Sequence, residues 1–292
     1  MRILIKEGEY RLSRAGCMDA KLDAEELFCF LTGLDRVGIF LRAQEEVDKE
    51  TEEQYMELIE RRAQRIPLQH ITGVQEFMGY KFKVSPDVLV PRQDTEILVT
   101  EAARIIREER RAEPSFFRRI RGDREWKVLD LCCGSGAIGI SLAKICDNAA
   151  VTMTDISDKA LEIARENADS LRAGVEIFQG DMFEPVKGRK FDMIVTNPPY
   201  IRTNMIALLQ EEVKEHEPVM ALDGGRDGLD YYRTIVARAA RYLRPEGYLI
   251  MEIGYDQGEI LRKMLKDSGA YRPAEVLKDL PGRDRVVKCR LV

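Results

Sequence analysis

The stretch Val128-Leu-Asp-Leu-Cys-Cys-Gly-Ser-Gly-Ala-Ile-Gly139 carries the clearest sign of the fold in this chain of 292 residues. It opens as a short apolar run, turns around Gly134 and Gly136, and continues into an apolar helical pattern. Glycines let a backbone turn sharply and approach a ligand closely, while free N–H groups at the start of the next helix attract a carboxylate or phosphate. The stretch therefore predicts a buried strand, a turn that contacts a ligand, and a helix.

Strand and helix patterns alternate on the carboxyl side of this stretch. Ser157 is placed to cap one of the helices. Such alternation is typical of an α/β fold whose parallel sheet is covered by helices on both faces. A last apolar stretch at 286–292 follows a turn and is expected to close the sheet as a hairpin strand. The predicted strands are 127–131, 150–154, 175–179, 191–196 and 248–253, and the predicted helices are 137–146, 158–171, 231–243 and 257–266.

The amino-terminal part of the chain has a different texture. Apolar residues recur there at helical spacing between charged residues, which predicts a small helical bundle. Thr51 and Gln54 form a capping-box pattern at the start of one helix. Aromatic and β-branched residues between 73 and 90 indicate a short hairpin or extended connector, and 94–112 reads as a helix.

The length of the chain favours two domains. We expect a helical substrate-recognition domain, a hairpin and helical connector, and a domain that holds the ligand turn. The expected boundaries are 1–80, 81–127 and 128–292.

Composition and charge exclude several classes of protein. Hydrophobic residues make up 45% and charged residues 33%, a composition that argues against a disordered or fibrous protein. The net charge is −5, so the chain has no global attraction to nucleic acid or anionic membrane. The stretch 104–127 is the exception, with a local charge of +4 that fits either a solvated surface or a polyanion contact.

Six cysteines without a Cys-x-x-Cys pair predict neither a zinc site nor a disulfide framework. No apolar run is long enough to span a bilayer, so we expect no membrane association. Together with the cysteine pattern, this leads us to expect a cytoplasmic protein without a bound metal.

Three acidic residues at successive strand ends point to the ligand. Asp155 lies 21 residues after Gly134, where a carboxylate can accept hydrogen bonds from both ribose hydroxyls of an adenosine cofactor. That spacing alone serves both NAD and S-adenosylmethionine. Asp130 favours S-adenosylmethionine, because an acid before the turn would repel a pyrophosphate but can bind an ammonium group directly or through water. Asp181, after the third strand, is placed to receive the adenine amino group.

The tetrad Asn197-Pro-Pro-Tyr200 follows the fourth predicted strand directly. Its two prolines fix the backbone and donate no hydrogen bond, so the carbonyls are free to accept. The Asn197 side-chain oxygen and the Pro198 carbonyl can hold both hydrogens of a planar NH2 group and aim its nitrogen at a methyl donor. Tyr200 would offer its ring to the planar group and the nearby positive charge. An ordinary turn is the alternative reading of the tetrad taken alone.

With these motifs and their flanking segments, the chain resembles the release-factor glutamine methyltransferase family, also called HemK or PrmC, over nearly its whole length. The tetrad alone is shared with adenine-N6 DNA methyltransferases, so the flanking segments carry the specificity. The resemblance rests on Pro67-Leu-Gln-His-Ile-Thr-Gly73, Glu76-Phe-Met-Gly79, Phe82-Lys-Val-Ser-Pro-Asp-Val-Leu-Val-Pro-Arg-Gln-Asp-Thr-Glu96, 130–136, 197–200, Ala221-Leu-Asp-Gly-Gly-Arg-Asp-Gly-Leu-Asp-Tyr-Tyr232, Glu252-Ile-Gly-Tyr-Asp-Gln-Gly258 and Asp279-Leu-Pro-Gly-Arg-Asp-Arg285.

The resemblance implies an amino-terminal helical bundle and a Rossmann-like methyltransferase domain with a mostly parallel, seven-stranded sheet. It implies methyl transfer from S-adenosylmethionine to the glutamine amide of the Gly-Gly-Gln motif in peptide chain release factors. S-adenosylhomocysteine would be the product, and no stable nucleic-acid partner is expected. The implied cofactor residues are Asp130, Cys132, Cys133, Gly134, Ser135, Gly136, Asp155, Asp181, Met182 and Asn197; the implied substrate residues are Asn197, Pro198, Pro199, Tyr200 and Arg92, of which Asn197, Pro198 and Tyr200 would be catalytic.

The chain departs from the family pattern at three positions. Cys132 stands where Gly is frequent, Met182 where an aromatic residue is frequent, and Gln93 where Pro is frequent. We expect an altered cofactor affinity rather than a lost function. Two other functions stay open at this point, an adenine-N6 methyltransferase acting on DNA or RNA and a cofactor-binding module without catalysis.

Overall fold

The computed structural model describes residues 1–112 and 124–292. The described chain divides into two compact units. The first comprises Met1–Val74 with Leu209–His216, and the second comprises Gln75–Leu208 with Glu217–Val292. Residues 113–123, in the middle of the basic stretch 104–127, lie outside the described residues, and so does much of the choice between a solvated surface and a polyanion contact for that stretch.

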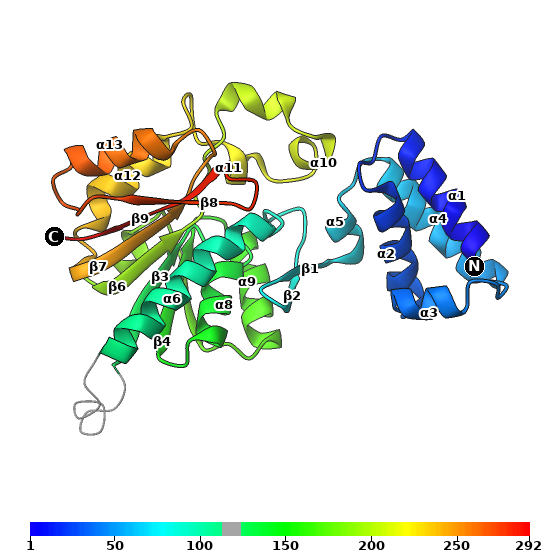
Figure 1. Ribbon diagram of the computed structural model, residues 1–292, viewed down its shortest axis with the longest axis horizontal. Coiled ribbons are helices and arrows are strands. Elements are labelled where there is room, and N and C mark those ends of the chain that lie inside the picture. Colours follow the sequence, from blue (N-terminus) through cyan, green and yellow to red (C-terminus); the bar gives the residue numbers. More distant parts are fainter. Residues whose placement is uncertain (113–123) are drawn as a thin grey trace. The chain divides into compact units, whose positions relative to one another are not determined.

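The first unit is a small bundle of helices, and the predicted bundle is confirmed; in Figure 1 its amino-terminal helices run from blue to cyan, while α10 (Glu211–Lys214) is yellow-green. Its core contains Phe28 and Tyr55, whose rings pack edge to face with centroids 5.3 Å apart. The buried Tyr55 hydroxyl donates to the Ala24 carbonyl at 3.1 Å, so its polar end is satisfied. The helices are α1 (Arg2–Arg14), α2 (Ala20–Thr32), α3 (Arg36–Leu41), α4 (Lys49–Ala63), α5 (Leu68–Thr72) and α10 (Glu211–Lys214).

The predicted capping box at Thr51 and Gln54 is wrong. Helix α4 begins at Lys49, and its N-cap is Asp48, whose carboxylate accepts from the Thr51 backbone N–H at 2.9 Å. Thr51 is therefore the third helical residue, and its hydroxyl donates back to Asp48 at 2.8 Å. An aspartate three residues earlier caps as well as a threonine, so the local pattern did not distinguish the two starting points.

The second unit opens with the predicted hairpin, which is confirmed. Strands β1 (Val74–Phe77) and β2 (Tyr80–Lys83) form a two-stranded sheet. A short 3-10 turn, η1 (Gln93–Thr95), then leads directly into helix α6 (Glu96–Ala112).

The second unit is organised around one seven-stranded sheet with the order β5-β4-β3-β6-β7-β9-β8. The five strands from β5 to β7 are parallel, while β9 runs antiparallel to both of its neighbours. Strand order therefore reverses between β3 and β6, and ligands of such sheets bind beside this switch point at the carboxyl ends of the strands. The strands are β3 (Trp126–Leu131), β4 (Ala149–Asp155), β5 (Val175–Gln179), β6 (Phe191–Thr196), β7 (Leu243–Glu252), β8 (Glu275–Lys278) and β9 (Asp284–Arg290).

Helices cover both faces of the sheet, as predicted (Figure 1). Val128 of β3 joins a core with α6, α8 and α9, while the next residue, Leu129, joins a second core with α12 and α13. Successive strand residues point to opposite faces, so an apolar run buries both. The remaining helices of this unit are α8 (Ala137–Ile145), α9 (Asp158–Ser170), η2 (Glu184–Val186), η3 (Thr203–Leu208), α11 (Val219–Leu222), α12 (Asp230–Ala239) and α13 (Gly258–Asp267).

The carboxyl-terminal strands differ from expectation in two ways. β7 begins at Leu243, five residues before the predicted start, because the strand continues across an irregularity in its pairing with β6. Pro245 and Gly247 lie in this part and resemble a turn in sequence. The closing strand β9 is not at the sheet edge, since the unpredicted four-residue strand β8 pairs outside it.

Asn167 on α9 joins three segments of the second unit and was not predicted. Its side-chain oxygen accepts from the Lys83 N–H at 2.7 Å, and its nitrogen donates to the Lys83 and Ser135 carbonyls, both at 3.0 Å. The residue is 1% exposed. It thus ties the hairpin to α9 and to the Gly-rich turn.

We expect Asn167→Ala to lower the free energy of unfolding by about 3 kcal/mol, because it leaves several buried backbone groups without partners. Ser170→Ala is the matched control on the same helix, since Ser170 is exposed and its hydroxyl donates only to the Asn167 carbonyl. That control should change stability by less than about 0.5 kcal/mol. Urea unfolding of both variants measures the difference, and equal midpoints would contradict the assigned role.

Candidate functional site

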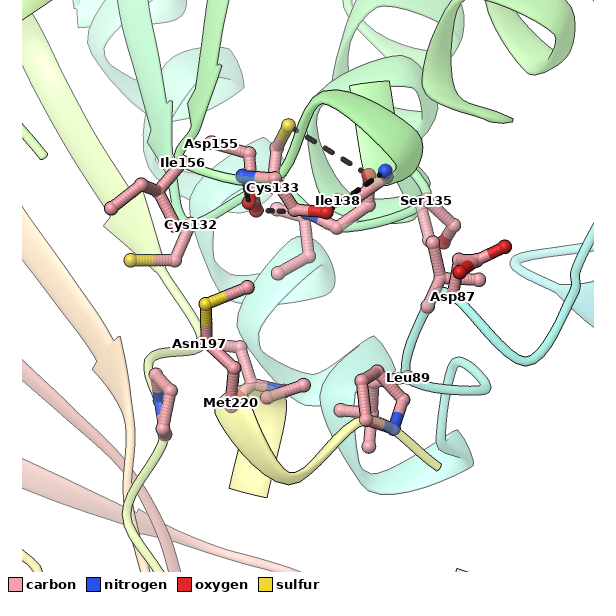
Figure 2. Close-up of a pocket in the computed structure, with 18 of the residues that line it drawn as sticks. Asp87, Leu89, Cys132, Cys133, Ser135, Ile138, Asp155, Ile156, Asn197 and Met220 are labelled. Atoms are coloured by element: carbon pink, nitrogen blue, oxygen red, sulfur yellow. Dashed lines mark hydrogen bonds between the residues drawn. The ribbon is translucent and has the colours of Figure 1, made fainter. Parts of the chain in front are cut away.

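A cavity of about 360 Å³ opens at the carboxyl ends of β3, β4 and β6, beside the switch point of the sheet. Figure 2 shows the Gly-rich turn and Asp155 at one part of its wall and Asn197 with Met220 at another. The volume lies within the range of pockets for small ligands. The cavity wall includes the predicted site residues Arg92, Cys132, Cys133, Gly134, Ser135, Asp155, Asp181, Met182, Asn197 and Pro199, but not Asp130, Gly136, Pro198 or Tyr200.

The Gly-rich turn needs its glycines for two different reasons. Gly134 has φ +55°, and a Cβ placed on it would meet no heavy atom within 4 Å, so this side of the turn is open. Gly136 has φ +80° and is the N-cap of α8, and a Cβ there would lie 2.8 Å from Ile140. The first glycine thus leaves room in front of the turn, while the second permits close packing behind it.

Cys132 occupies a backbone conformation that favours glycine, with φ +60°. Burial raises the pKa of its thiol, as it does for Cys133, so both sulfurs are protonated at neutral pH. The Cys132 side chain therefore lines the cavity with a small, uncharged group, and its positive φ costs some backbone strain.

We expect Cys132→Gly to keep or slightly raise the free energy of unfolding, while Cys132→Val lowers it, with about 2 kcal/mol between the two variants. A β-branched residue is strongly disfavoured at this φ, whereas glycine adopts it freely. Thermal unfolding of the two variants side by side tests the difference. Equal stabilities would mean that the backbone at this position adapts to its side chain.

Asp155 ends β4 and holds the Gly-rich turn in place. One carboxylate oxygen accepts from the Gly134 N–H at 2.8 Å, and the other accepts from the Ser157 N–H at 2.9 Å. Each oxygen has a second lone pair, so both can still accept from a ligand hydroxyl. Ser157 in turn caps α9 as predicted, accepting from the Ala160 N–H at 3.2 Å.

Asp130 lies behind the turn and is fully buried. Its Oδ2 accepts from the Gly139 N–H in the first turn of α8 at 2.8 Å, while Oδ1 is buried without a hydrogen bond. A Cβ on Gly139 would lie 2.9 Å from this carboxylate, which explains the third glycine of the motif. Burial raises the pKa of Asp130 to about 8. Its expected contact with an ammonium group stays a prediction.

Asp181 and Met182 follow β5 and complete this end of the wall. Asp181 is exposed, whereas Met182 is 8% exposed with φ +49°. The Thr154 hydroxyl donates to the Met182 carbonyl at 3.3 Å and fixes the segment against β4. At this end the wall offers a carboxylate that can accept from ribose hydroxyls, an open glycine turn and an apolar methionine, and these residues fit S-adenosylmethionine.

Asn197 and Pro199 are the tetrad residues that line the cavity, and Figure 2 shows the Asn197 side chain at its wall. Asn197 Nδ2 donates to the Thr95 hydroxyl at 3.4 Å. Thr95 ends the 3-10 turn η1 and is 4% exposed. This contact turns the amide so that the other end, the Oδ1 acceptor, is available to a ligand.

Tyr200 is held at both of its ends. Its hydroxyl donates to Glu252 Oε1 at 3.3 Å, and its backbone carbonyl accepts from Gln257 Nε2 at 3.1 Å. Two glycines pack against the same backbone, because a Cβ on Gly224 or Gly228 would lie 2.8 Å from Tyr200 Cα or 2.4 Å from its carbonyl oxygen. The expected stacking of the Tyr200 ring on the substrate amide stays a prediction.

Arg92 lines the cavity, and its guanidinium is paired with a carboxylate. Its Nη2 lies 2.6 Å from Glu217 Oε1, and Glu217 is 5% exposed. The pair links the segment before η1 to the segment that carries Pro218 and Met220, two further residues of the cavity wall. Its expected role in substrate binding stays a prediction.

Comparison with known proteins identifies the family. The PrmC N-terminal domain matches residues 4–73, and the methyltransferase small domain matches residues 115–224. A release factor glutamine methyltransferase from Geobacter sulfurreducens is 41% identical over 96% of this chain and 93% of that protein, and one from Moorella thermoacetica is 42% identical over 98% and 96%. The chain belongs to the release factor glutamine methyltransferase family. The resemblance inferred from its motifs is thereby confirmed.

The solved structures support the fold of this family member. The catalytic domain of hMettl16, solved in complex with MAT2A 3′UTR hairpin 6, matches with a TM-score of 0.54 and 13% sequence identity. The match covers 80% of this chain and 81% of that chain. At this identity the likeness concerns the fold alone, and it agrees with a Rossmann-like methyltransferase sheet.

Several polar residues of this methyltransferase were not assigned a role from the sequence. Thr95, Glu252 and Gln257 lie in segments that carried the family resemblance, but each acts on the tetrad from far away in the chain. Gly224 and Gly228 belong to such a segment too, and their spacing was the available signal of a close backbone approach.

Within 1–112 and 124–292, no group of three or more His, Cys, Asp or Glu side chains could hold a metal ion. No helix within those ranges is both long and apolar enough to cross a membrane.

Proposed function

We propose that this protein transfers the methyl group of S-adenosylmethionine to the side-chain amide nitrogen, N5, of the glutamine in the Gly-Gly-Gln motif of peptide chain release factors. S-adenosylhomocysteine is then the product. Relatives with this name align over nearly the whole chain, which supports the assignment. The cofactor occupies the cavity between the Gly-rich turn, Asp155 and Met182, and no metal takes part.

The single structural observation that carries the proposal is the orientation of Asn197 at the switch point of the sheet. Thr95 engages the Asn197 nitrogen, which leaves Oδ1 as an acceptor in the cavity. An amide –NH2 is a donor of two hydrogens, so it matches this acceptor. Within the described chain no backbone N–H donates to the Pro198 carbonyl, which is the second acceptor of the proposed pair.

The residues of the tetrad act by positioning the amide. When bound, S-adenosylmethionine supplies an electrophilic methyl group on a positively charged sulfur. Asn197 and Pro198 hold the two amide hydrogens, restrict the rotation of the nitrogen, and turn its weakly available lone pair toward the methyl. The carbonyl oxygens of Asn197 and Pro198 also stabilise the positive charge that develops on the nitrogen during the transfer.

The proposed reaction needs no general base before attack, because the nitrogen loses its proton after it has gained the methyl group. The two histidines of the chain belong to the helical unit, whereas the tetrad belongs to the sheet unit. We assign both histidines structural roles.

The helical unit is proposed to hold the release factor. It matches the PrmC N-terminal domain, and it exposes apolar side chains that a protein partner could cover. On α3, Val37, Phe40 and Leu41 are 63%, 79% and 76% exposed.

The proposed partner places the enzyme in the cytoplasm, without stable binding to nucleic acid or membrane.

The test uses S-adenosylmethionine with a labelled methyl group and two acceptors in parallel, a purified release factor and DNA. The matched control acceptor is the same release factor with the Gln of Gly-Gly-Gln replaced by Ala. We expect label in the unaltered release factor, none in the altered one, and none in DNA.

Each other outcome favours one alternative. Label in DNA without label in the release factor would assign the tetrad to adenine-N6 methylation. Binding of the cofactor without transfer to either acceptor would favour a non-catalytic cofactor-binding module.

A further inference from the structure

The side-chain amide of Asn197 can present either of two opposite surfaces to the cavity. With Oδ1 toward the substrate it accepts from an amide –NH2, whereas with Nδ2 in that place it would repel an –NH2 and attract a carboxylate. The two orientations have nearly the same shape, so packing alone does not choose between them. A group with a defined hydrogen-bond polarity must make that choice.

Thr95 is the residue in contact with the Asn197 amide. Its hydroxyl accepts from Asn197 Nδ2 at 3.4 Å. A hydroxyl has one proton to donate as well as lone pairs to accept with, so its own proton must point elsewhere. The Thr95 side chain interacts with the buried Glu252 carboxylate, whose Oε2 is without a hydrogen-bond partner, so we assign that carboxylate as the acceptor of the proton.

Glu252 ends β7 and is 1% exposed. Its Oε1 accepts from the Tyr200 hydroxyl at 3.3 Å, while Oε2 is buried without a hydrogen-bond partner. The charged side chains around it are Arg285, whose positive charge stabilises the carboxylate, and Asp94, which opposes it. Arg285 is itself 3.0 Å from Asp94 and 3.1 Å from Asp279.

An ionised carboxylate only accepts hydrogen bonds, so it defines the direction of the whole chain of contacts. Glu252 draws the Thr95 proton toward itself, the Thr95 oxygen is left to accept from Asn197 Nδ2, and Asn197 Oδ1 is left for the substrate. We propose that Thr95 and Glu252 are positioning residues that orient the Asn197 amide as an acceptor and thereby select a glutamine amide over a glutamate carboxylate. This inference rests on the proposed function.

Protonation of Glu252 would reverse the direction of these hydrogen bonds. A neutral Glu252 can donate to Thr95, whose hydroxyl is then free to donate to Asn197 Oδ1 and so turn Nδ2 toward the substrate. Burial raises the pKa of Glu252 to about 7 against the opposing effects of Thr95, Arg285 and Tyr200. Because the acceptor orientation needs the ionised form, kcat should fall as the pH drops through about 7.

Thr95→Val tests the first contact, because it replaces the hydroxyl by a methyl group of the same size. We expect kcat for the release factor to fall about 10-fold, as for the loss of one oriented hydrogen bond. The Kd for S-adenosylmethionine should stay within about 2-fold, which shows that the cavity is intact. Thr95→Ser keeps the hydroxyl and should recover most of the lost kcat.

A second measurement separates orientation from general damage. A release factor with Gly-Gly-Glu in place of Gly-Gly-Gln serves as a competitive inhibitor, and its Ki is compared with the Kd of the Gly-Gly-Gln protein. The wild-type enzyme should bind the glutamate form more weakly, and Thr95→Val should reduce that preference about 10-fold. A merely structural defect would weaken both ligands together and leave the ratio unchanged.

Glu252→Gln tests the source of the polarity, because a glutamine can donate or accept toward Thr95. We expect a similar loss of the amide preference and a pH profile of kcat without the step near pH 7. The wild-type profile, measured in the same buffers, should keep that step.

The results distinguish two kinds of failure. If the wild-type enzyme methylates no glutamine, the proposed function fails and this inference fails with it. If the wild-type enzyme methylates the glutamine but Thr95→Val keeps both kcat and the amide preference, the inference alone is overturned.

Discussion

Asn197→Ala is expected to lower kcat about 1,000-fold, the size of effect seen when an oriented polar contact in a transition state is removed. The alanine provides no acceptor for the substrate amide, so the nitrogen rotates freely and its lone pair is rarely aligned with the methyl group. The Kd for S-adenosylmethionine should change by less than about 3-fold, because the turn and Asp155 are unaffected. Single-turnover kinetics and calorimetry measure the two quantities separately.

Asn204→Ala is the matched control for this variant. Asn204 lies on η3, seven residues after Asn197, and is exposed. Its replacement should leave kcat within about 2-fold of the wild type. If Asn197→Ala retained more than a tenth of the wild-type kcat, the proposed role of its side-chain oxygen would be wrong.

Asp155→Asn is expected to weaken the binding of S-adenosylmethionine about 100-fold. The carboxylate oxygens accept from the Gly134 and Ser157 N–H groups, and each keeps a lone pair for a ribose hydroxyl. An amide would place its NH2 group against one of these two donors and remove charge from the other contacts. Losing one or two hydrogen bonds to a charged group corresponds to about 3 kcal/mol.

Calorimetric titration of the free enzyme measures this loss directly. Asp158→Asn, at the exposed first turn of α9, is the control and should keep the Kd within about 2-fold. A wild-type affinity in Asp155→Asn would show that the ribose is held elsewhere and would move the cofactor away from β4.

The sequence predicted the elements whose signals are local. The strand, turn and helix around Gly134 and the cap at Ser157 each depend on a few adjacent residues, and the structure confirms them. β7 was placed too late because Pro245 and Gly247 resemble a turn, although pairing with β6 carries the strand across them. β8 has four residues and exists because β9 offers it an edge, so no local pattern could predict it.

In the candidate site, too, the residues with local sequence signals were predicted, and the contacts that form only on folding were not. Asn197 and Asp155 follow strands directly, and their places at the cavity come from the switch point of a parallel sheet. Thr95 and Glu252 are separated by more than 150 residues and meet only after folding, so their joint action on one amide had no sequence signal. Asp130 was predicted from its position before the turn, but only the structure separates its bonded oxygen from its orphaned one.

The most direct test of the central claim is tandem mass spectrometry of a release factor after turnover with the wild-type enzyme and S-adenosylmethionine. The account predicts a single added methyl group, located on the side-chain amide nitrogen of the glutamine in Gly-Gly-Gln. A methyl group on a carboxylate, on another residue, or on no residue of the release factor would contradict it.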